Sequence, residues 1–444
     1  MNRWTALAML GLFTVHSRAE PVSYHRDIVP ILRANCYSCH KPGKTKGDLD
    51  LTTHAGVLKG GKHEDHVVAG KPDHSGLFES IHGAEPEMPK EGEPLIAAEV
   101  ELIRRWIADG AKNDTPATIT RTPASPPTYR SLPAIPSIAF SPDGSLLAVA
   151  GHHEILLHAA DGSGPIARLL GDSPRIEALA FSTDGKILAA CGGSPSEFGE
   201  VQVWDVAARK LIRSIKTSND TVYGVSLSPD ATHVAIGCAD KLVRAFRIAD
   251  GEQVMQCDNH IDWVLATAWS LDGKKLATAG RDKALKLIDV ATGHLIDDIN
   301  IPREPLLALA RNPKADVILS AGENGQLFLH KMEPRGGRLA EGDNKEHSAI
   351  KEVERMPGPV HAVAWNADGT RIAAGGARGE VRIWSAPDGK RITTLKEPIP
   401  GVFALAFSAD SQRLAVAGAD GQIRLYDPAK GEKLAEFPSV PLTP

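Results

Sequence analysis

Two thiols and an imidazole lie within five residues of one another in the segment Cys-Tyr-Ser-Cys-His, which ends at His40. This spacing is typical of c-type haem attachment, in which each thiol adds to a haem vinyl group and the histidine reaches the iron. A helical conformation would suit this chemistry, because positions i, i+3 and i+4 share one helix face. The sequence therefore predicts one covalently bound haem c, held by Cys36, Cys39 and His40.

Other uses of the paired cysteines explain the segment less well. A disulfide between Cys36 and Cys39 is the main alternative, but it would leave His40 without a role. A zinc site of the paired-cysteine type needs a second Cys-x-x-Cys pair, which the chain lacks. A thioredoxin-like redox motif belongs in a βαβ unit, and no such pattern surrounds this segment.

An iron bound on one side by His40 needs a second axial ligand, and Met88 is the candidate. Pro89 follows it and favours an extended backbone, so a loop can present the thioether. A thioether opposite a histidine raises the reduction potential, whereas a second histidine would lower it. The alternative ligands are histidines, each expected to be solvated or hydrogen-bonded at the surface: His25, His54, His63, His66, His74 and His82.

Two helices are expected to position these residues. Residues 23–40 carry a group of apolar side chains that leads into the motif, with Pro30 close enough to the start to be tolerated. Residues 94–111 place Val100, Ile103 and Ile107 at helical spacing, and Gly110 is a natural C-terminal stop.

Residues 20–114 resemble the cytochrome c domain found in exported proteins of planctomycetes and related bacteria. The resemblance rests on the segments RDIVPIL, NCYSCH, KGDLDLTT, GKPDHSGL, MPK and LIRRWIADGA. It implies thioether links at Cys36 and Cys39, with His40 as the proximal ligand and Met88 as the distal one. The chain departs from the family at Lys90, where a second proline is usual. It departs again at Ile96, where Ser or Thr usually opens the last helix and its cap contributes about 1 kcal/mol.

The first 19 residues have the pattern of a secretory signal peptide. Arg3 precedes an apolar run, and Ser17-Arg18-Ala19 is a small-x-small site, with cleavage expected after Ala19. The run is too short for a membrane span, which needs about 20 residues. The net charge of −5 gives no sign of a nucleic-acid partner. We therefore expect a periplasmic or otherwise exported protein with no transmembrane segment in the mature chain.

The remainder of the chain repeats. A segment of the type Ala-Phe-Ser-x-Asp-Gly ends at residues 144, 185, 231, 273, 315, 369 and 411. A period of about 40–45 residues with four strands per copy is typical of a propeller blade, and seven blades close a ring without a long exposed edge. Residues 133–438 resemble a WD40 propeller. The Trp-Asp signature remains at Trp204-Asp205, and blade four retains most of the family's buried polar set: His260, Thr278 and Asp282.

The predicted fold is multidomain. A small all-α cytochrome c domain (20–114) follows the signal peptide (1–19), and a Pro/Thr/Ser-rich linker (115–132) leads to an all-β, seven-bladed WD40-like propeller (133–444). Small buried residues such as Ala150, Ala279, Ala321 and Ala417 are expected to hold the degenerate blades together. The insertion at 333–355 should lie between the third and fourth strands of blade five, and Cys191, Cys238 and Cys257 should be small buried hydrophobes.

Three functions are compatible with these features. The first is a non-catalytic electron carrier with one haem, a redox partner protein and a propeller that serves as a docking platform. The second is a redox enzyme with a further cofactor or substrate site in the propeller, although no histidine is placed there for a second haem. The third is a haem-based redox sensor or scaffold. The methionine ligand favours electron transfer, because it leaves no open position on the iron.

Overall fold

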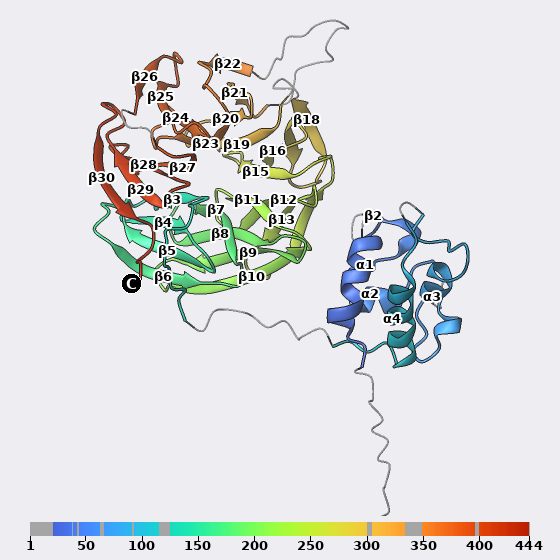
Figure 1. Cartoon of the computed structure of the whole chain (residues 1–444). Coiled ribbons are helices and arrows are strands. Elements are labelled where there is room, and N and C mark those ends of the chain that lie inside the picture. The colour runs from blue at the N-terminus through green and yellow to red at the C-terminus, as the bar shows by residue number, and fades with distance from the viewer. Residues whose placement is uncertain are drawn as a thin grey trace, which may run out of the picture. The chain divides into compact units, whose positions relative to one another are not determined.

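Short helices make up most of the first part of the chain, and antiparallel strands make up the rest (Figure 1). The computed structural model describes residues 21–37, 39–41, 44–62, 66–90, 93–114, 125–299, 304–333, 349–395 and 399–443. The chain separates into two units, Met1–Ile119 and Thr120–Pro444. The expected signal peptide lies outside the described residues, so it stays a prediction.

The N-terminal unit is mainly helical, as expected. Its elements are η1 (Tyr24–Ile28), α1 (Val29–Asn35), β1 (His40–Lys41), β2 (Lys44–Thr45), η2 (Lys46–Asp48), α2 (His54–Lys59), η3 (Pro72–His74), α3 (Gly76–Ile81) and α4 (Ala97–Ala108). The first is a π-helical turn, the other two η elements are 3-10 turns, and β1 pairs antiparallel with β2.

Pro30 accounts for the change of pitch in the first helix. The helix begins after Ser23, whose hydroxyl accepts a hydrogen bond from the Arg26 amide at 2.9 Å. Proline has no N–H to donate and crowds the turn before it. That turn is π-helical, and α-helical spacing starts at Val29, with Pro30 in the first turn of α1. Ile28 and Leu32 are fully buried on the inner face of this helix.

Helix α4 buries Ile103, Trp106 and Ile107 in the same core as the first helix. Its N-terminus lacks a side-chain cap, because Ile96 has no polar atom to offer. The Glu99 carboxylate accepts a hydrogen bond from the Ile96 amide at 3.2 Å, which supplies the other half of a capping box. The helix ends as predicted before Gly110, which has a φ of 96°.

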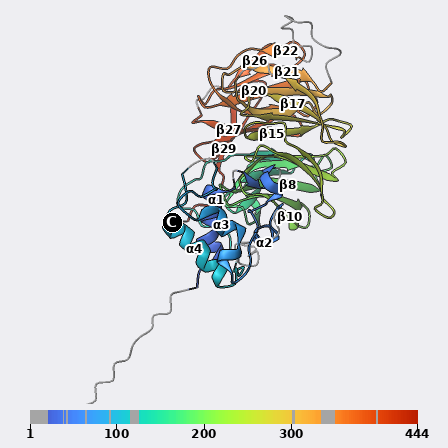
Figure 2. The ribbon, with the colours of Figure 1, turned by 90° about the vertical axis from the view of Figure 1, so that its right-hand side faces the viewer.

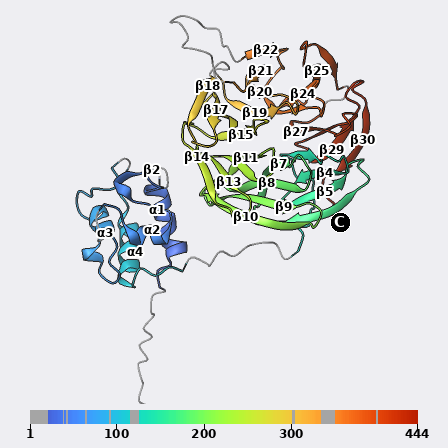
Figure 3. The same ribbon diagram turned by 180° about the vertical axis from the view of Figure 1, so that it is seen from behind.

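The second unit is a seven-bladed β-propeller, which confirms the predicted fold class. Each blade is a four-stranded antiparallel sheet, and the strands follow one another in chain order from the inner to the outer strand. Figure 3 shows the ring from behind, and Figure 2 turns it so that it is seen nearer its edge.

The strands of the first four blades are β3 (Ile138–Phe140), β4 (Leu146–Ala150), β5 (Glu154–Ala159), β6 (Pro165–Leu170), β7 (Arg175–Phe181), β8 (Ile187–Ser194), β9 (Phe198–Asp205), β10 (Lys210–Ser218), β11 (Val222–Leu227), β12 (His233–Cys238), β13 (Val243–Arg247), β14 (Gln253–Cys257), β15 (Val264–Trp269), β16 (Lys275–Gly280), β17 (Leu285–Asp289) and β18 (Leu295–Ile299).

Those of the last three blades are β19 (Leu306–Arg311), β20 (Val317–Gly322), β21 (Leu327–Lys331), β22 (Ala349–Val353), β23 (Val360–Trp365), β24 (Arg371–Gly376), β25 (Val381–Ser385), β26 (Arg391–Thr394), β27 (Val402–Phe407), β28 (Leu414–Gly418), β29 (Gln422–Tyr426) and β30 (Lys433–Pro438).

The ring closes between blade seven and blade one without exchange of a strand. Tyr129 forms a parallel bridge with Leu442, and its carbonyl accepts a hydrogen bond from the Thr443 amide at 2.9 Å. Its side chain is 8% exposed and packs in the propeller core. Residues 125–132 were expected to belong to the Pro/Thr/Ser-rich linker. The structure differs, because Tyr129 fastens this segment to the seam.

Small residues pack the blades, as the sequence indicated. Ala150, Ala279, Ala321 and Ala417 are all buried in the second strands of their blades. Close packing of this kind leaves few voids between neighbouring sheets. The core nevertheless holds more polar contacts than the sequence suggested, in several blades besides the fourth.

Buried and half-buried acids tie the third strands of these blades to their surroundings. Glu154 of β5 pairs with Arg168 at 2.5 Å. Glu200 of β9 accepts hydrogen bonds from Ser173 at 2.6 Å and from the Gln202 amide at 2.8 Å. Further Arg–Asp pairs lie at the third strands of blades three and seven: Arg244–Asp240 and Arg424–Asp420. These contacts give each of the carboxylates a polar partner.

The insertion falls where it was expected, since β21 and β22 flank residues 334–348. The last part of the predicted insertion is itself the strand β22. Cys191, Cys238 and Cys257 are buried, unpaired thiols in strands β8, β12 and β14, so their interpretation as small buried hydrophobes is confirmed.

Candidate haem site

The cysteine motif forms a turn directly after α1. Cys36 is the C-cap residue of the helix, and its carbonyl accepts hydrogen bonds from the amides of Cys39 at 3.1 Å and His40 at 3.0 Å. The expectation of a continuous helix through the motif is therefore wrong. The Asn35 side chain donates to the Ile31 carbonyl at 3.0 Å, and such local bonds compete with helix continuation. The hydrogen bond from the His40 amide to the Cys36 carbonyl still has the i to i+4 spacing of an α-helical turn.

The Cys36 thiol lies partly buried against the helical core. Burial raises the pKa of this thiol to about 11, and the neighbouring Cys39 adds to the rise. A thiol that stays protonated at neutral pH is a poor redox nucleophile, because only the thiolate attacks. This environment disfavours a reactive redox dithiol at this position.

His40 follows in strand β1, and its imidazole carries an unsatisfied atom. Its carbonyl accepts a hydrogen bond from the Leu51 amide at 3.0 Å, which holds the backbone in place. The ring Nδ1 is buried and has no hydrogen-bond partner among the described residues. Buried polar atoms are rarely left unpaired in native proteins, and an exception calls for an explanation.

His66 shows the same feature and lies near His40. Its Nε2 is buried without a partner among the described residues. Burial, together with the proximity of His40, lowers the pKa of His66 to about 4. His66 is therefore neutral at physiological pH. From the sequence, we expected His66 to lie at the surface like the other histidines of this unit. No local sequence pattern distinguishes His66 from those histidines.

Met88 is positioned by the loop before α4. Its amide donates a hydrogen bond to the Ser80 carbonyl, near the end of α3, at 2.9 Å. Its side chain is partly buried and packs against the core that Cys36 also contacts. The thioether and the cysteine motif thus border one hydrophobic cluster, although they are 48 residues apart in the sequence.

The other candidate histidines of this unit are engaged elsewhere or exposed. The His54 Nε2 lies 2.8 Å from the Ala111 carbonyl, and its ring meets Tyr24 edge to face. His82 is exposed and stacks on Phe78, with 4.7 Å between ring centroids. His25 and His74 are exposed as well. His63 lies outside the described residues.

These observations together fit a haem. Two thiols, an imidazole with an orphaned nitrogen and a thioether form a donor set suited to covalent attachment and axial ligation. The residues that would hold the group are Cys36, Cys39, His40 and Met88, with His66 close to the imidazole.

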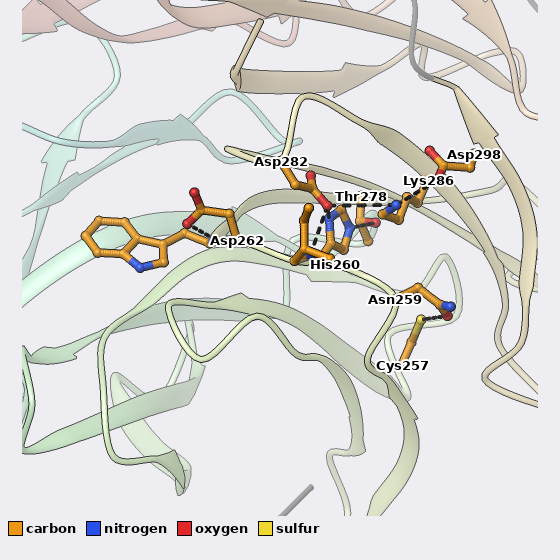
Figure 4. Close-up of polar contacts among 10 residues, drawn as sticks. Cys257, Asn259, His260, Asp262, Thr278, Asp282, Lys286 and Asp298 are labelled. Carbon is orange, nitrogen blue, oxygen red and sulfur yellow. Dashed lines mark hydrogen bonds and ion pairs between the residues drawn. The ribbon is translucent and has the colours of Figure 1, made fainter. Parts of the chain in front are cut away.

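Blade four of the propeller holds a second polar cluster (Figure 4). The two His260 ring nitrogens lie 2.8 Å from Asp282 Oδ2 and 2.8 Å from Thr278 Oγ1. The Lys286 ammonium lies 3.8 Å from the same Asp282 oxygen and donates to Asp298 at 2.9 Å. Burial by itself would raise the pKa of the Asp282 carboxyl. The hydrogen bond and the charge of His260 act in the opposite direction, and the pKa of Asp282 is lowered overall. The cluster is a structural network inside the blade.

Comparison with protein families finds matches in both units. Residues 36–92 match the family model described as planctomycete cytochrome C. Residues 350–385 and 389–427 match the WD domain, G-beta repeat, and residues 225–310 match the WD40 domain of anaphase-promoting complex subunit 4. The chain joins a planctomycete-type cytochrome c domain to a WD40 propeller.

Curated relatives are similar to parts of this chain. The angio-associated migratory cell proteins of Homo sapiens and Pongo abelii are each 27% identical over 207 residues, which is 40% of this chain and 48% of the relative. The WD repeat and SOCS box-containing protein 1 of Danio rerio is 31% identical over 94 residues, which is 21% of this chain and 22% of the relative. The chain thus spans half or less of the length of these relatives.

No helix among the described residues is long and apolar enough to cross a membrane.

Proposed function

We propose that this protein is an exported electron carrier with one covalently attached haem c, and that its WD40 propeller docks a redox partner protein. The observation that carries the proposal is the turn at residues 36–40, where Cys36 packs against the same core as Met88 and is followed by Cys39 and by a histidine with an orphaned buried nitrogen. The match of residues 36–92 to the planctomycete cytochrome C family supports it.

The bound haem would supply one-electron redox chemistry. This chain's own residues would hold and tune it: Cys36 and Cys39 through thioether links, His40 and Met88 as ligands to the iron. The hydrophobic core around Met88 would exclude water from that side. The neutral His66 adds no positive charge beside His40. It would therefore not oppose oxidation of the haem iron, which adds positive charge there.

The attachment is tested by expression with a cytochrome-maturation system. The wild type should keep haem on a denaturing gel, and the double variant Cys36→Ala, Cys39→Ala should lose it. Cys257→Ala is a matched control, because that thiol lies in the propeller and should leave haem attachment unchanged. Covalent haem in the double variant would contradict the proposal.

The axial ligand is tested by spectroscopy of the oxidised protein. A methionine ligand should give a weak near-infrared charge-transfer band, and Met88→Ala should abolish it. His66→Ala should leave the band in place. If the band is absent from the wild type and His66→Ala changes the visible spectrum, histidine ligation replaces the methionine assignment.

A further inference from the structure

The N-terminal unit buries polar side-chain atoms that its own hydrogen bonds do not satisfy. Among its described residues, four such atoms have no hydrogen-bond partner: the Tyr24 hydroxyl, Arg33 Nε, His40 Nδ1 and His66 Nε2. A buried donor or acceptor without a partner costs free energy, so native proteins rarely keep one. Two of the four are ring nitrogens of histidines, and a single interaction can satisfy both.

Hydrogen bonds fix the backbone of the segment that carries His66. Upstream, the Lys62 amide donates to the Gly47 carbonyl at 2.9 Å, which ties this segment to the residues that follow the β1–β2 hairpin of His40. Downstream, the His66 carbonyl accepts a hydrogen bond from the Leu77 amide of α3 at 2.9 Å. The position of His66 along the chain is therefore set on both sides by the fold.

The rings of His66 and His40 lie close together. Val67, the residue after His66, packs against the hydrophobic core that Cys36 of the haem motif also contacts. The charge of His40 contributes to the lowered pKa of His66, which is an effect of proximity. The two unpartnered nitrogens therefore belong to neighbouring rings.

The chemistry of the two nitrogens is complementary. A histidine that binds a metal through Nε2 carries its proton on Nδ1 and almost always donates it to an acceptor, as His40 would. The His66 Nε2 is such an acceptor when the proton of its neutral ring is on the other nitrogen. Of the remaining unpartnered atoms, Arg33 Nε can only donate. The Tyr24 ring packs on Trp106 of α4, with 5.2 Å between ring centroids.

We propose that His66 is a positioning residue for the haem ligand: its Nε2 accepts a hydrogen bond from His40 Nδ1 in the haem-loaded protein. The two nitrogens are not yet bonded in the structure, and the bond would close when ligation fixes the orientation of the His40 ring. An acceptor at this place makes the imidazole a stronger electron donor and favours oxidised iron. This inference rests on the proposed haem attachment, and it concerns how the chain sets the reduction potential.

Direct ligation of the iron is the other use of a buried imidazole nitrogen. His66 would then replace Met88 and would leave His40 Nδ1 without an acceptor. Met88 already borders the core at the haem motif, and its amide is held by the Ser80 carbonyl at 2.9 Å. A hydrogen bond between the imidazoles satisfies both orphaned nitrogens and keeps the thioether as the ligand.

The direct test is nuclear magnetic resonance of the reduced, haem-loaded full chain with isotope-labelled histidine. Reduced iron with histidine and methionine ligands is diamagnetic, so the nitrogen signals of both rings can be followed. A coupling between His40 Nδ1 and His66 Nε2 across the hydrogen bond is expected. Absence of this coupling would overturn the inference, and so would a His66 Nε2 signal typical of a nitrogen bound to iron.

The reduction potential of variants provides the second test. His66→Ala should raise the equilibrium constant for reduction by about tenfold, which is about 59 mV for one electron. His66→Gln retains a side-chain oxygen that can accept from His40, so it should restore most of the wild-type potential. His25→Ala is the matched control, because that histidine of the same unit is exposed, and it should keep the wild-type potential.

The outcomes separate this inference from the haem assignment. The near-infrared methionine band of the wild type reports the ligands independently of the potential. An unchanged potential in His66→Ala with that band in place would overturn the role of His66 and leave the haem assignment standing. Equal shifts in His66→Ala and His66→Gln would also overturn it, because a purely structural role does not depend on an acceptor atom.

Discussion

His330 should make the propeller sensitive to mild acid. It lies in β21 of blade five, is 1% exposed, and has no hydrogen-bond partner on either ring nitrogen among the described residues. It faces Ile318 across the ladder, and its ring centroid lies 5.8 Å from that of Phe328. Burial alone lowers the pKa of His330 from its usual 6.5 to about 4.

The sign follows from the direction of this shift. The folded state disfavours the protonated ring, so the uncharged form stabilises the fold. This contribution is fully present above the unfolded pKa of 6.5 and is lost as the pH falls from there towards 4. At 1.36 kcal/mol per pKa unit, the full loss is about 3 kcal/mol, of which about 2 kcal/mol is lost between pH 7 and pH 5.

The assay is urea unfolding of the full chain at pH 7 and pH 5, followed by tryptophan fluorescence. His330→Trp and His330→Leu should each reduce the loss of stability at pH 5 by about 2 kcal/mol relative to wild type. Tryptophan is suited to the site, because Trp204 and Trp384 occupy the same register in blades two and six. His294→Gln, an exposed control, should follow the wild type. If both His330 variants keep the wild-type pH dependence, the buried-imidazole argument is refuted.

Three further predictions concern the propeller. Asp282→Ala removes a buried carboxylate from its histidine and lysine partners and should lower the free energy of unfolding by about 3 kcal/mol, whereas Asp258→Ala, at an exposed position, should change it little; equal effects would contradict the blade-four network. Tyr129→Phe removes a 2.6 Å hydrogen bond to Glu154 and should cost about 1.5–3 kcal/mol, measured as a lower melting temperature; an unchanged melting temperature would show that the seam does not need it. Residues 125–444 expressed alone should fold without haem, as judged by a cooperative melt, because their core is formed by blade packing; an unfolded fragment would indicate an obligate interface with the cytochrome unit.

Much of the architecture could be predicted because its signals are local or periodic. The Cys-x-x-Cys-His spacing predicted a haem motif, and seven repeats of similar length predicted seven blades. Pro30 and Gly110 marked helix boundaries through backbone rules that need no tertiary contact. Buried alanines such as Ala279 were expected because degenerate blades must be held together by small residues. Each of these features depends on neighbouring residues or on the repeat itself.

Only the tertiary structure decided which distant residues meet. His66 resembled five other histidines until the fold placed its buried nitrogen near His40. From the sequence, Tyr129 was predicted to belong to a linker. In the structure it pairs with Leu442, more than 300 positions later, where the ring closes. Glu177 and Tyr223 come from different blades and face one cavity. Burial and pairing of such groups depend on long-range packing, which a local sequence pattern does not encode, so the physical state of these residues was set by the fold.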